Sequence, residues 1–331
     1  MTSQLRTIES RFDIAASQAR LPIPQLKVLI PYDGSERSVS AFNDLKRAGL
    51  PANLHALVAV TNVWLPMSPY EITRAVTDRR MKTLRSGVSS FVPALRDYEE
   101  QRVLSFEVER HVRKMFPNAS VKAEALPDVA FVTNDILQKA KKWPADLIIV
   151  GANASPSPQI TDYAGPAIKV AKEAHCSVRI ARASDHAIES PVRIIIGVDG
   201  SDRSKQVVRT VANRRWLPGS QVRLIAVRKS GPRHTDWETT LNLTHFTDAL
   251  RAVGLEVSSA VVEGKPDNIL LNEAAKFSPD SIFVQASGLG NQLNDRAAFD
   301  DVTQAIAIGA DCSVEIVRES YLGDIDMRPA A

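Results

Sequence analysis

The sequence predicts an α/β protein of two tandem domains, each with a parallel β-sheet covered by helices on both faces. Residues 28–38 return as residues 194–204, so one apolar run that ends in Asp-Gly-Ser is written twice. Each run is rich in β-branched residues and too short for a buried helix, which indicates a buried parallel strand that turns into a helix. Further segments recur in the same order, as a duplicated domain requires.

The repeated segments also locate an insertion in the first copy. The further matches pair residues 57–60 with 224–227, 146–150 with 280–284, and 176–182 with 312–318. The copies are roughly 166 residues apart before Val60 and roughly 135 apart after Asp146, so the first copy holds about 30 additional residues between these positions.

The second copy gives the element order of one domain. Short apolar runs predict strands at 192–198, 221–227, about 255–262, 281–285 and 313–318. The segments between them predict helices at 201–213, about 237–253, 266–276 and about 300–310. The first helix follows the Asp-Gly-Ser turn, and Gly264-Lys265-Pro266-Asp267 ends the third strand and starts the third helix. Strands of the buried type that alternate with helices imply a parallel sheet.

The first copy follows the same order, with a helical insertion at about 65–116 in place of the short second helix. Val92-Pro93 interrupts this insertion, and residues 98–115 have the pattern of a charged helix. We interpret the basic residues of 79–85 as a solvated helix face, with a partner-binding surface as the alternative. The predicted limits are an N-terminal extension at 1–24, domains at 25–184 and 191–319, and a tail at 320–331.

Composition excludes some classes of partner. The 331 residues carry a formal net charge of +3 that is spread along the chain, so no nucleic-acid footprint is present. No apolar run approaches the roughly 20 residues of a membrane helix, and the first residues lack the apolar core of a secretory signal. We therefore expect a cytoplasmic protein with no nucleic-acid and no membrane partner. Cys176 and Cys312 each open the last strand of a copy, where we interpret them as packing residues.

These residues resemble the universal stress protein family, in particular its tandem-domain members. The likeness covers about 25–319 and rests on the Asp-Gly-Ser strands, Gly-Lys-Pro at 264–266, Asp-Leu-Ile-Ile-Val-Gly at 146–151, and Cys-Ser-Val-x-Ile at 176–180 and 312–316. It implies Rossmann-like domains of the adenine nucleotide alpha hydrolase type, each a doubly wound five-stranded sheet of order 3-2-1-4-5. It also implies that the last strands pair, here within one chain as a pseudo-dimer. A homodimer of chains and an unidentified protein partner stay open as further forms of association.

The resemblance implies an ATP site at the carboxyl ends of the strands, built from Gly-x-x-Gly, nine residues, and Gly-Ser or Gly-Thr at the start of the last helix. In the first copy Gly151 fills the first position, Ala154 replaces the second glycine, and Gly165 is followed by proline. Pro156 and Pro158 remove backbone donors from the loop, so the phosphate cradle is impaired. If binding is retained, the candidate residues are Asp33, Val60, Val150, Gly151, Ala154, Ser155 and Gly165.

The second copy departs further from the pattern. Gln285 takes the first glycine position, and the last helix opens with Asp300 and Asp301. Two carboxylates at a helix N-terminus satisfy its dipole and repel a polyphosphate, so we expect this site to be inactive. The equivalent residues are Asp199, Val227, Gln285, Gly288, Asp300 and Asp301.

Asp33 and Asp199 hold the position whose carboxylate contacts the nucleoside in family members that bind nucleotide. The alternative, which we favour, is that each fixes its Asp-Gly-Ser turn or caps the following helix. The sequence shows no nucleophile elbow, no P-loop and no metal-ligand spacing among its six histidines.

These observations favour a non-catalytic stress-response protein that acts through its surfaces, has degenerate nucleotide sites and holds no cofactor or metal. One alternative is a sensor that binds ATP or another adenine nucleotide in the first domain only. The other is a hydrolase or phosphotransferase, for example a weak ATPase, although no group of residues in the sequence points to one.

Overall fold

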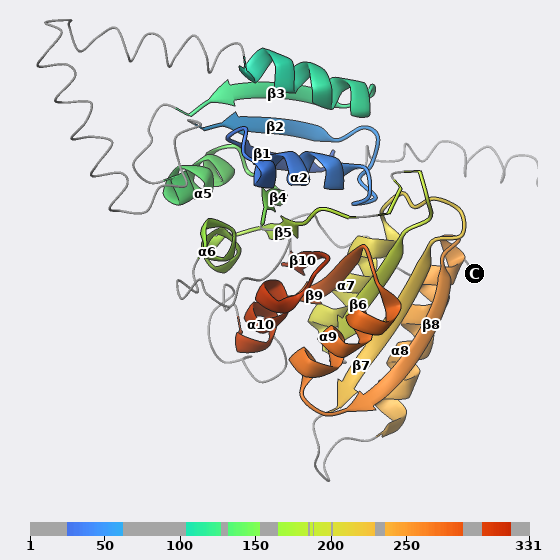
Figure 1. Cartoon of the computed structure of the whole chain (residues 1–331). Coiled ribbons are helices and arrows are strands. Elements are labelled where there is room, and N and C mark those ends of the chain that lie inside the picture. Colours follow the sequence, from blue (N-terminus) through green and yellow to red (C-terminus); the bar gives the residue numbers. More distant parts are fainter. Residues whose placement is uncertain are drawn as a thin grey trace, which may run out of the picture. The chain divides into compact units, whose positions relative to one another are not determined.

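The computed structural model contains two successive α/β domains of the same design (Figure 1). It describes residues 25–61, 104–126, 132–152, 165–184, 186–187, 189–199, 201–228, 236–286 and 300–318. The first domain consists of β1 (Lys27–Tyr32), α2 (Glu36–Leu45), β2 (His55–Val60), β3 (Ser120–Ala125), α5 (Val132–Lys142), β4 (Leu147–Gly151), α6 (Pro166–Glu173) and β5 (Ser177–Ala181). Residues 104–115 are also helical.

The second domain repeats this order. It consists of β6 (Arg193–Val198), α7 (Asp202–Ala212), β7 (Gln221–Arg228), α8 (Asp236–Ala252), β8 (Glu256–Glu263), α9 (Pro266–Phe277), β9 (Ser281–Gln285), α10 (Asp301–Gly309) and β10 (Ser313–Val317). The α/β class and the strand and helix positions predicted for the second copy are confirmed, with differences of one or two residues at the ends.

The strands form one ten-stranded sheet of order β3-β2-β1-β4-β5-β10-β9-β6-β7-β8. Within each domain all neighbouring strands are parallel, and the order counted along the chain is 3-2-1-4-5 in both. β5 and β10 pair antiparallel and join the two halves. The predicted strand order and the pseudo-dimer formed by the last strands are confirmed.

The central strands are apolar on both faces because helices cover both. Val28, Leu29 and Ile30 of β1 are almost completely buried. Burial of one such side chain stabilises the fold by roughly 1.5–3 kcal/mol relative to exposure. The edge strand β8 instead has mostly exposed side chains, as is typical of a sheet edge.

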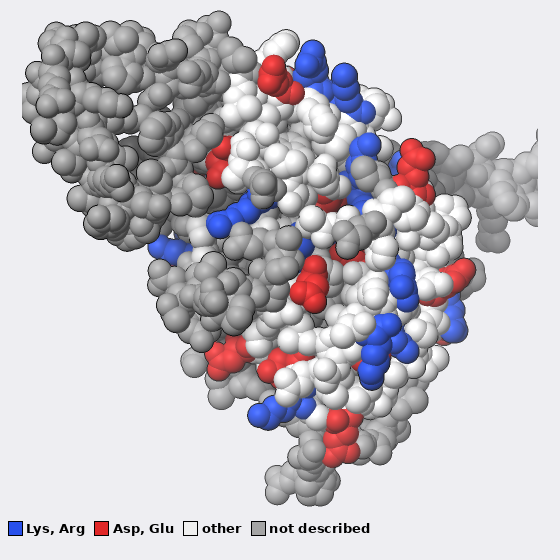
Figure 2. All heavy atoms as spheres, viewed as in Figure 1, with Lys and Arg blue, Asp and Glu red and all other residues white. Residues whose placement is uncertain are grey.

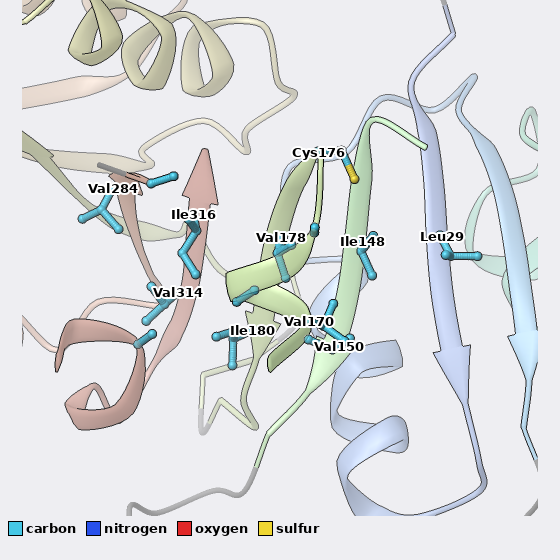
Figure 3. Close-up of a cluster of buried hydrophobic side chains, with 14 of the residues drawn as sticks. Leu29, Ile148, Val150, Val170, Cys176, Val178, Ile180, Val284, Val314 and Ile316 are labelled. Atoms are coloured by element: carbon cyan, nitrogen blue, oxygen red, sulfur yellow. The ribbon is translucent and has the colours of Figure 1, made fainter. Parts of the chain in front are cut away.

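The apolar core differs between the two faces of the sheet. On one face a single cluster runs through both domains, and Val178, Ile180, Val314 and Ile316 of the paired strands β5 and β10 lie in it (Figure 3). On the other face the first domain packs α2 against its strands, and the second domain packs α7 and α8, as two separate clusters. The side chains that separate these two clusters at the β5–β10 junction are charged, as described below.

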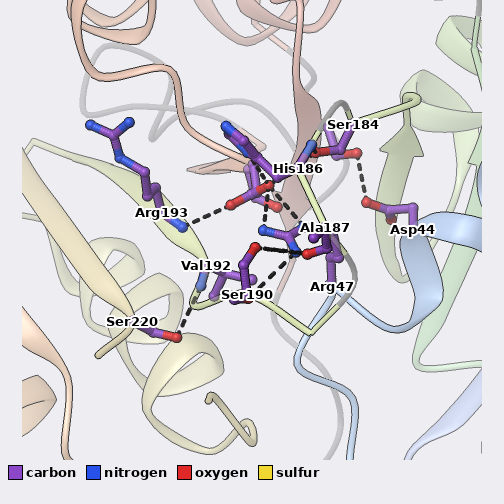
Figure 4. A network of polar contacts seen from close by, with 12 residues as sticks. Asp44, Arg47, Ser184, His186, Ala187, Ser190, Val192, Arg193 and Ser220 are labelled. Atoms are coloured by element: carbon purple, nitrogen blue, oxygen red, sulfur yellow. Dashed lines mark hydrogen bonds and ion pairs between the residues drawn. The ribbon is translucent and has the colours of Figure 1, made fainter. Parts of the chain in front are cut away.

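The segment between the domains is held by a polar cluster around Asp280 (Figure 4). Asp280 Oδ1 accepts hydrogen bonds from Arg47 Nε (2.8 Å) and Ser184 Oγ (3.1 Å), and Oδ2 accepts from the Arg193 backbone N–H (2.8 Å). His186 Nδ1 lies 2.8 Å from Asp280 Oδ1. Because Arg47 belongs to the first domain and Asp280 to the second, this cluster ties both domains to the connecting segment.

Other predictions about organisation lie partly outside the described residues. The N-terminal extension at 1–24, the tail at 320–331 and most of the insertion at 65–116 lie outside them, and only residues 104–116 of the insertion are described. The domain limits 25–184 and 191–319 therefore remain predictions. Within the described part of the chain, the helices are too short or too polar to span a membrane.

Candidate functional site

The residues predicted for the first nucleotide site gather at the carboxyl edge of the sheet. Asp33 follows β1, Val60 ends β2, and Val150 and Gly151 end β4. β1 lies between β2 and β4 in the sheet, so these positions are neighbours. Gly165 directly precedes α6. Ala154 and Ser155 lie outside the described residues.

Asp33 is engaged with its own turn. Its Oδ1 accepts a hydrogen bond from the Ser35 backbone N–H at 3.0 Å, which is the geometry of an Asx-turn. Ser35 is the N-cap of α2, and its side chain accepts from the Ser38 backbone N–H. The serine therefore caps the helix, while the aspartate fixes the turn that precedes it.

Tyr32, the last residue of β1, adds a neutral hydroxyl beside Asp33. Its ring packs edge-on against Phe42, with centroids 4.8 Å apart. Burial raises the pKa of Tyr32, and the negative charges of Asp33 and Glu107 raise it further. The phenol therefore stays protonated at neutral pH and can donate a hydrogen bond.

Gly151 is required by packing. A Cβ atom on this residue would lie 1.8 Å from the Arg37 carbonyl oxygen, far closer than any van der Waals contact. Arg37 belongs to the first turn of α2, so the absence of a side chain at the end of β4 lets the helix approach the sheet. From the sequence, this glycine was expected to let the backbone approach a phosphate. Its role in the packing of α2 against β4 was not foreseen.

The N-terminus of α6 lacks the side-chain cap that the N-terminus of α10 has. Gly165 is the N-cap, Pro166 is the first helical residue, and none of the described side chains caps the helix. A Cβ on Gly165 would have no atom of the described residues within 4 Å. The first backbone N–H groups of this helix are thus left without a side-chain acceptor from the cap residue.

The second domain fills the corresponding places with polar side chains. Asp199 Oδ1 accepts from the Ser201 backbone N–H (3.0 Å) and from Ser204 Oγ (2.8 Å). Gln285 lies at the end of β9, and its Oε1 accepts hydrogen bonds from Ser201 Oγ at 3.3 Å and from Ser204 Oγ at 3.4 Å. The space that Gly151 leaves to the helix backbone in the first domain is thus lined here by a glutamine that bonds to the first turn of α7.

The last helix of the second domain has its own acidic cap. Asp300 is the N-cap of α10, and its Oδ1 accepts from the Thr303 backbone N–H at 2.8 Å. Asp301 adds a second carboxylate in the first turn. Val227 lies in β7, and Gly288 lies outside the described residues. The acidic helix start expected from the sequence is present.

The cysteines lack the properties of reactive thiols. Cys176 and Cys312 are not in a disulfide bond. Burial raises the pKa of both thiols to about 12, although Arg318 and Arg182 lie near enough to oppose the shift. Low-pKa, exposed thiolates are the reactive ones, so these thiols are inert packing groups.

The described residues form no metal site, and charges of both signs are mixed on the face shown in Figure 2. Within the described ranges, no group of three or more His, Cys, Asp or Glu side chains is placed to hold a metal ion. On the face shown in Figure 2, Lys and Arg side chains are interspersed with Asp and Glu. This face therefore carries no single-sign patch among the described residues.

Sequence reasoning missed the buried charges at the junction of the domains. Arg179 and Glu315 are 0 % exposed, and Asp44 and Arg214 contact them. The sequence did contain a signal for them, because Arg179 and Glu315 place charges of opposite sign at equivalent positions of two otherwise apolar runs.

Comparison with known proteins identifies the fold. The model of the Universal stress protein family matches residues 192–318. A crystal structure of a universal stress protein from Archaeoglobus fulgidus DSM 4304 superimposes with a TM-score of 0.55 at 14% identity, covering 89% of this chain and 97% of that chain. A search of curated proteins found no significant match.

Shorter solved structures match one domain's length. A universal stress protein in complex with cAMP has 20% identity and a TM-score of 0.29, covering 39% of this chain and 98% of that chain. A universal stress protein from Archaeoglobus fulgidus in complex with dAMP has 19% identity and a TM-score of 0.30, covering 38% of this chain and 98% of that chain. The second domain matches the model of the Universal stress protein family, and the first domain repeats the same fold.

Proposed function

We propose that this protein is a non-catalytic regulatory member of the universal stress protein family, that it works through its surfaces as an intramolecular pseudo-dimer, and that neither of its domains binds nucleotide. The observation that carries the proposal is the N-terminus of α10. Asp300 accepts the Thr303 N–H, which a phosphate would otherwise receive, and Asp301 adds a further negative charge. A helix start binds anions through free N–H groups and a positive dipole, and here one of those N–H groups is already bonded and two carboxylates offset the dipole.

The first domain supports the same proposal more weakly. Gly151 is kept, but its packing against the Arg37 carbonyl accounts for it without any ligand. Asp33 is kept, but its hydrogen bond to the Ser35 N–H accounts for it as a turn residue. Neither residue therefore requires a nucleotide to explain its presence.

One observation favours a second candidate function, which is adenine-nucleotide sensing by the first domain alone. The N-terminus of α6 has no side-chain cap, unlike that of α10. An uncapped helix start at the carboxyl edge of the sheet is where a doubly wound fold binds a phosphorylated ligand. ATP or another adenine nucleotide is the ligand class that the family resemblance suggests.

The experiment that separates the two candidates measures nucleotide stoichiometry. The purified protein is denatured and the released adenine nucleotide is counted per chain, and the nucleotide-free protein is then titrated with ATP by calorimetry. The proposed function predicts less than about one nucleotide per ten chains and no saturable heat. One nucleotide per chain would support the sensor and would overturn the proposal.

Matched variants assign any binding that is observed. Asp33→Ala and Asp199→Ala remove equivalent carboxylates from the two domains. If the sensor is correct, Asp33→Ala abolishes saturable binding and Asp199→Ala leaves it unchanged. A hydrolase would show phosphate release from ATP that Asp33→Ala removes, and the proposal predicts no release above the buffer background.

A further inference from the structure

Arg179 and Glu315 face each other across the junction of the two domains. The β5–β10 register pairs Val178 with Ile316, Arg179 with Glu315, and Ile180 with Val314. Residues 176–182 and 312–318 are repeat equivalents, so Arg179 and Glu315 occupy the same position in the two copies. The pseudo-twofold axis therefore passes between them, and each residue is opposed by its own repeat equivalent.

The two side chains are the middle of a row of four buried charges. Arg179 Nη2 donates to Asp44 Oδ1 at 2.8 Å, and Arg179 Nη1 lies 3.4 Å from Glu315 Oε2. Glu315 Oε2 in turn accepts from Arg214 Nη1 at 2.8 Å, and a second bond joins Arg214 Nη2 to Glu315 Oε1. The charges along the row Asp44–Arg179–Glu315–Arg214 alternate in sign and sum to zero.

Hydroxyl and carbonyl groups satisfy the rest of the row. Arg179 Nη2 also lies 2.7 Å from Ser281 Oγ, and Ser313 Oγ donates to Asp44 Oδ1 at 2.7 Å. Arg214 Nη1 donates to the Ala48 carbonyl at 2.7 Å. These three contacts cross from one domain to the other, so they exist only when the unlike halves are paired.

The two domains contribute charge pairs of opposite polarity. In the first domain the acid, Asp44, is on α2 and the base, Arg179, is on the last strand. In the second domain the base, Arg214, follows α7 and the acid, Glu315, is on the last strand. The repeat equivalents of Asp44 and Arg214 are Thr210 and Ala48, so neither helix-side charge is inherited from a common pattern.

The reversed polarity decides which edges are compatible. If two first-domain edges met, the row would read acid, base, base, acid, with two buried guanidinium groups at the axis. If two second-domain edges met, two buried carboxylates would stand there. Like charges brought together at an interface cost several kcal/mol, whereas the unlike pairing has no such contact.

Arg179 stays protonated although it is buried. Burial lowers the pKa of its guanidinium, but the charges and hydrogen bonds of Asp44 and Glu315 outweigh this effect and leave the pKa above its ordinary value. In a pair of first-domain edges Asp44 would still face each guanidinium, and an arginine stays protonated in proteins, so two positive charges would meet at the axis.

We propose that this row of charges selects the partner of each sheet edge. The β5 edge pairs with a β10 edge and not with a second β5 edge. Apolar residues of similar size commonly give equal or greater stability than a buried ion pair, so stability alone does not account for the charges. In a homodimer with true twofold symmetry, the residue on the axis must oppose an identical residue. A tandem chain is free of this constraint, and the Arg179–Glu315 pair makes use of that freedom.

Two full-length single variants, Arg179→Glu and Glu315→Arg, test the proposal. Each places like charges at the axis within its own chain. When the two are mixed, the unaltered first domain of the Glu315→Arg chain meets the unaltered second domain of the Arg179→Glu chain. The native row of four charges is then rebuilt between two chains.

The variants are unfolded in urea and refolded separately and as an equimolar mixture, with one chain labelled with nitrogen-15, and the products are weighed by native mass spectrometry. We expect a mixed dimer that exceeds either self-dimer by roughly tenfold or more, as a buried like-charge contact requires. Lys276→Glu, at a side chain that is 69% exposed, is the control. It should form no mixed dimer with either variant, because its own halves remain paired.

Each other outcome overturns the proposal. Monomers of both variants with the stability of the unaltered chain would show that the axis charges select nothing. Self-dimers as abundant as the mixed dimer would show the same. Chains that fold neither alone nor together would show that each residue is needed for folding itself, because the mixture contains every native contact of one junction.

Discussion

Arg182 and Arg318 make reciprocal hydrogen bonds, each from the end of one domain's last strand to the last helix of the other domain. Arg182, just after β5, donates to the Ala307 carbonyl of α10 at 2.6 Å and to the Cys312 carbonyl at 3.0 Å. Arg318, just after β10, donates to the Ala171 carbonyl of α6 at 2.6 Å and to the Cys176 carbonyl at 3.3 Å. Each domain thus caps the C-terminal end of the other domain's last helix, where a cation also favours the helix dipole.

These reciprocal hydrogen bonds predict that Arg182→Ala and Arg318→Ala lower the free energy of unfolding by equal amounts. Each variant removes two charge-assisted hydrogen bonds and leaves buried carbonyls without donors, so each should lower the free energy of unfolding by roughly 2–3 kcal/mol. Urea denaturation measures this. Lys276→Ala is the control and should change the value by less than about 1 kcal/mol, because its ion pair is exposed. Losses that differ severalfold between the two arginine variants would contradict the symmetric role.

The lowered pKa of Asp280 should make the free energy of unfolding fall as the pH becomes acidic. Burial raises its pKa, but hydrogen bonds from Arg47, the Arg193 backbone and His186 outweigh burial, and the pKa is lowered. With a lowered folded-state pKa, the stabilisation is complete above the unfolded-state value of about 3.9 and is lost as pH falls through the folded-state value. Asp280→Asn should therefore cost roughly 3 kcal/mol at neutral pH, and the cost should shrink in acid.

Asp146 is the matched control for Asp280. It is the repeat equivalent, and its Oδ2 also accepts a backbone N–H, from Lys27 at 2.8 Å. Here burial dominates and the pKa is raised. A raised folded-state pKa makes the ionised form costly, so stability falls as pH rises through the range between the two pKa values. Relative to the unaltered chain, Asp146→Asn should gain stability with rising pH, and thermal unfolding between about pH 3 and 7 measures both variants. Parallel pH responses of the two variants would count against this assignment.

The two glycines of the first nucleotide site should respond differently to alanine. Gly151→Ala forces a Cβ to within 1.8 Å of the Arg37 carbonyl, so α2 must shift, at a cost of roughly 3 kcal/mol. Gly165→Ala meets no atom within 4 Å and should cost less than about 1 kcal/mol. Chemical denaturation compares them. Equal effects would show that the packing of α2 on β4 does not explain Gly151.

Both cysteines should be unreactive in the folded protein. A pKa of about 12 leaves only about one thiol in ten thousand ionised at pH 8, and the thiolate is the reacting form. Iodoacetamide should therefore leave Cys176 and Cys312 unmodified in buffer and alkylate both in urea, as read by mass spectrometry. Rapid alkylation in buffer would contradict the burial of these thiols.

The nucleotide sites show where sequence reasoning stops. The acidic start of α10 at Asp300 and Asp301 could be read from the chain, because a helix N-terminus depends on local residues alone. The role of Gly151 could not, because the atom that excludes a side chain there, the Arg37 carbonyl, is more than a hundred residues away in the chain. Gln285 was recognised as a departure from the glycine pattern, but its bonds to Ser201 and Ser204 depend on how close α7 lies to β9.

The class of the fold, its duplication and the succession of strands and helices along the chain follow from the sequence alone, because apolar runs and turn residues act locally and the repeat gives the same pattern twice. The order of the strands in the sheet was expected only from the family resemblance. The way in which the two halves recognise each other depends on contacts that form only in the folded chain. Asp44, Arg179, Arg214 and Glu315 are distant in the chain, and each alone reads as an ordinary charge. Their alternation appears only when an antiparallel junction places repeat equivalents opposite each other and removes them from water.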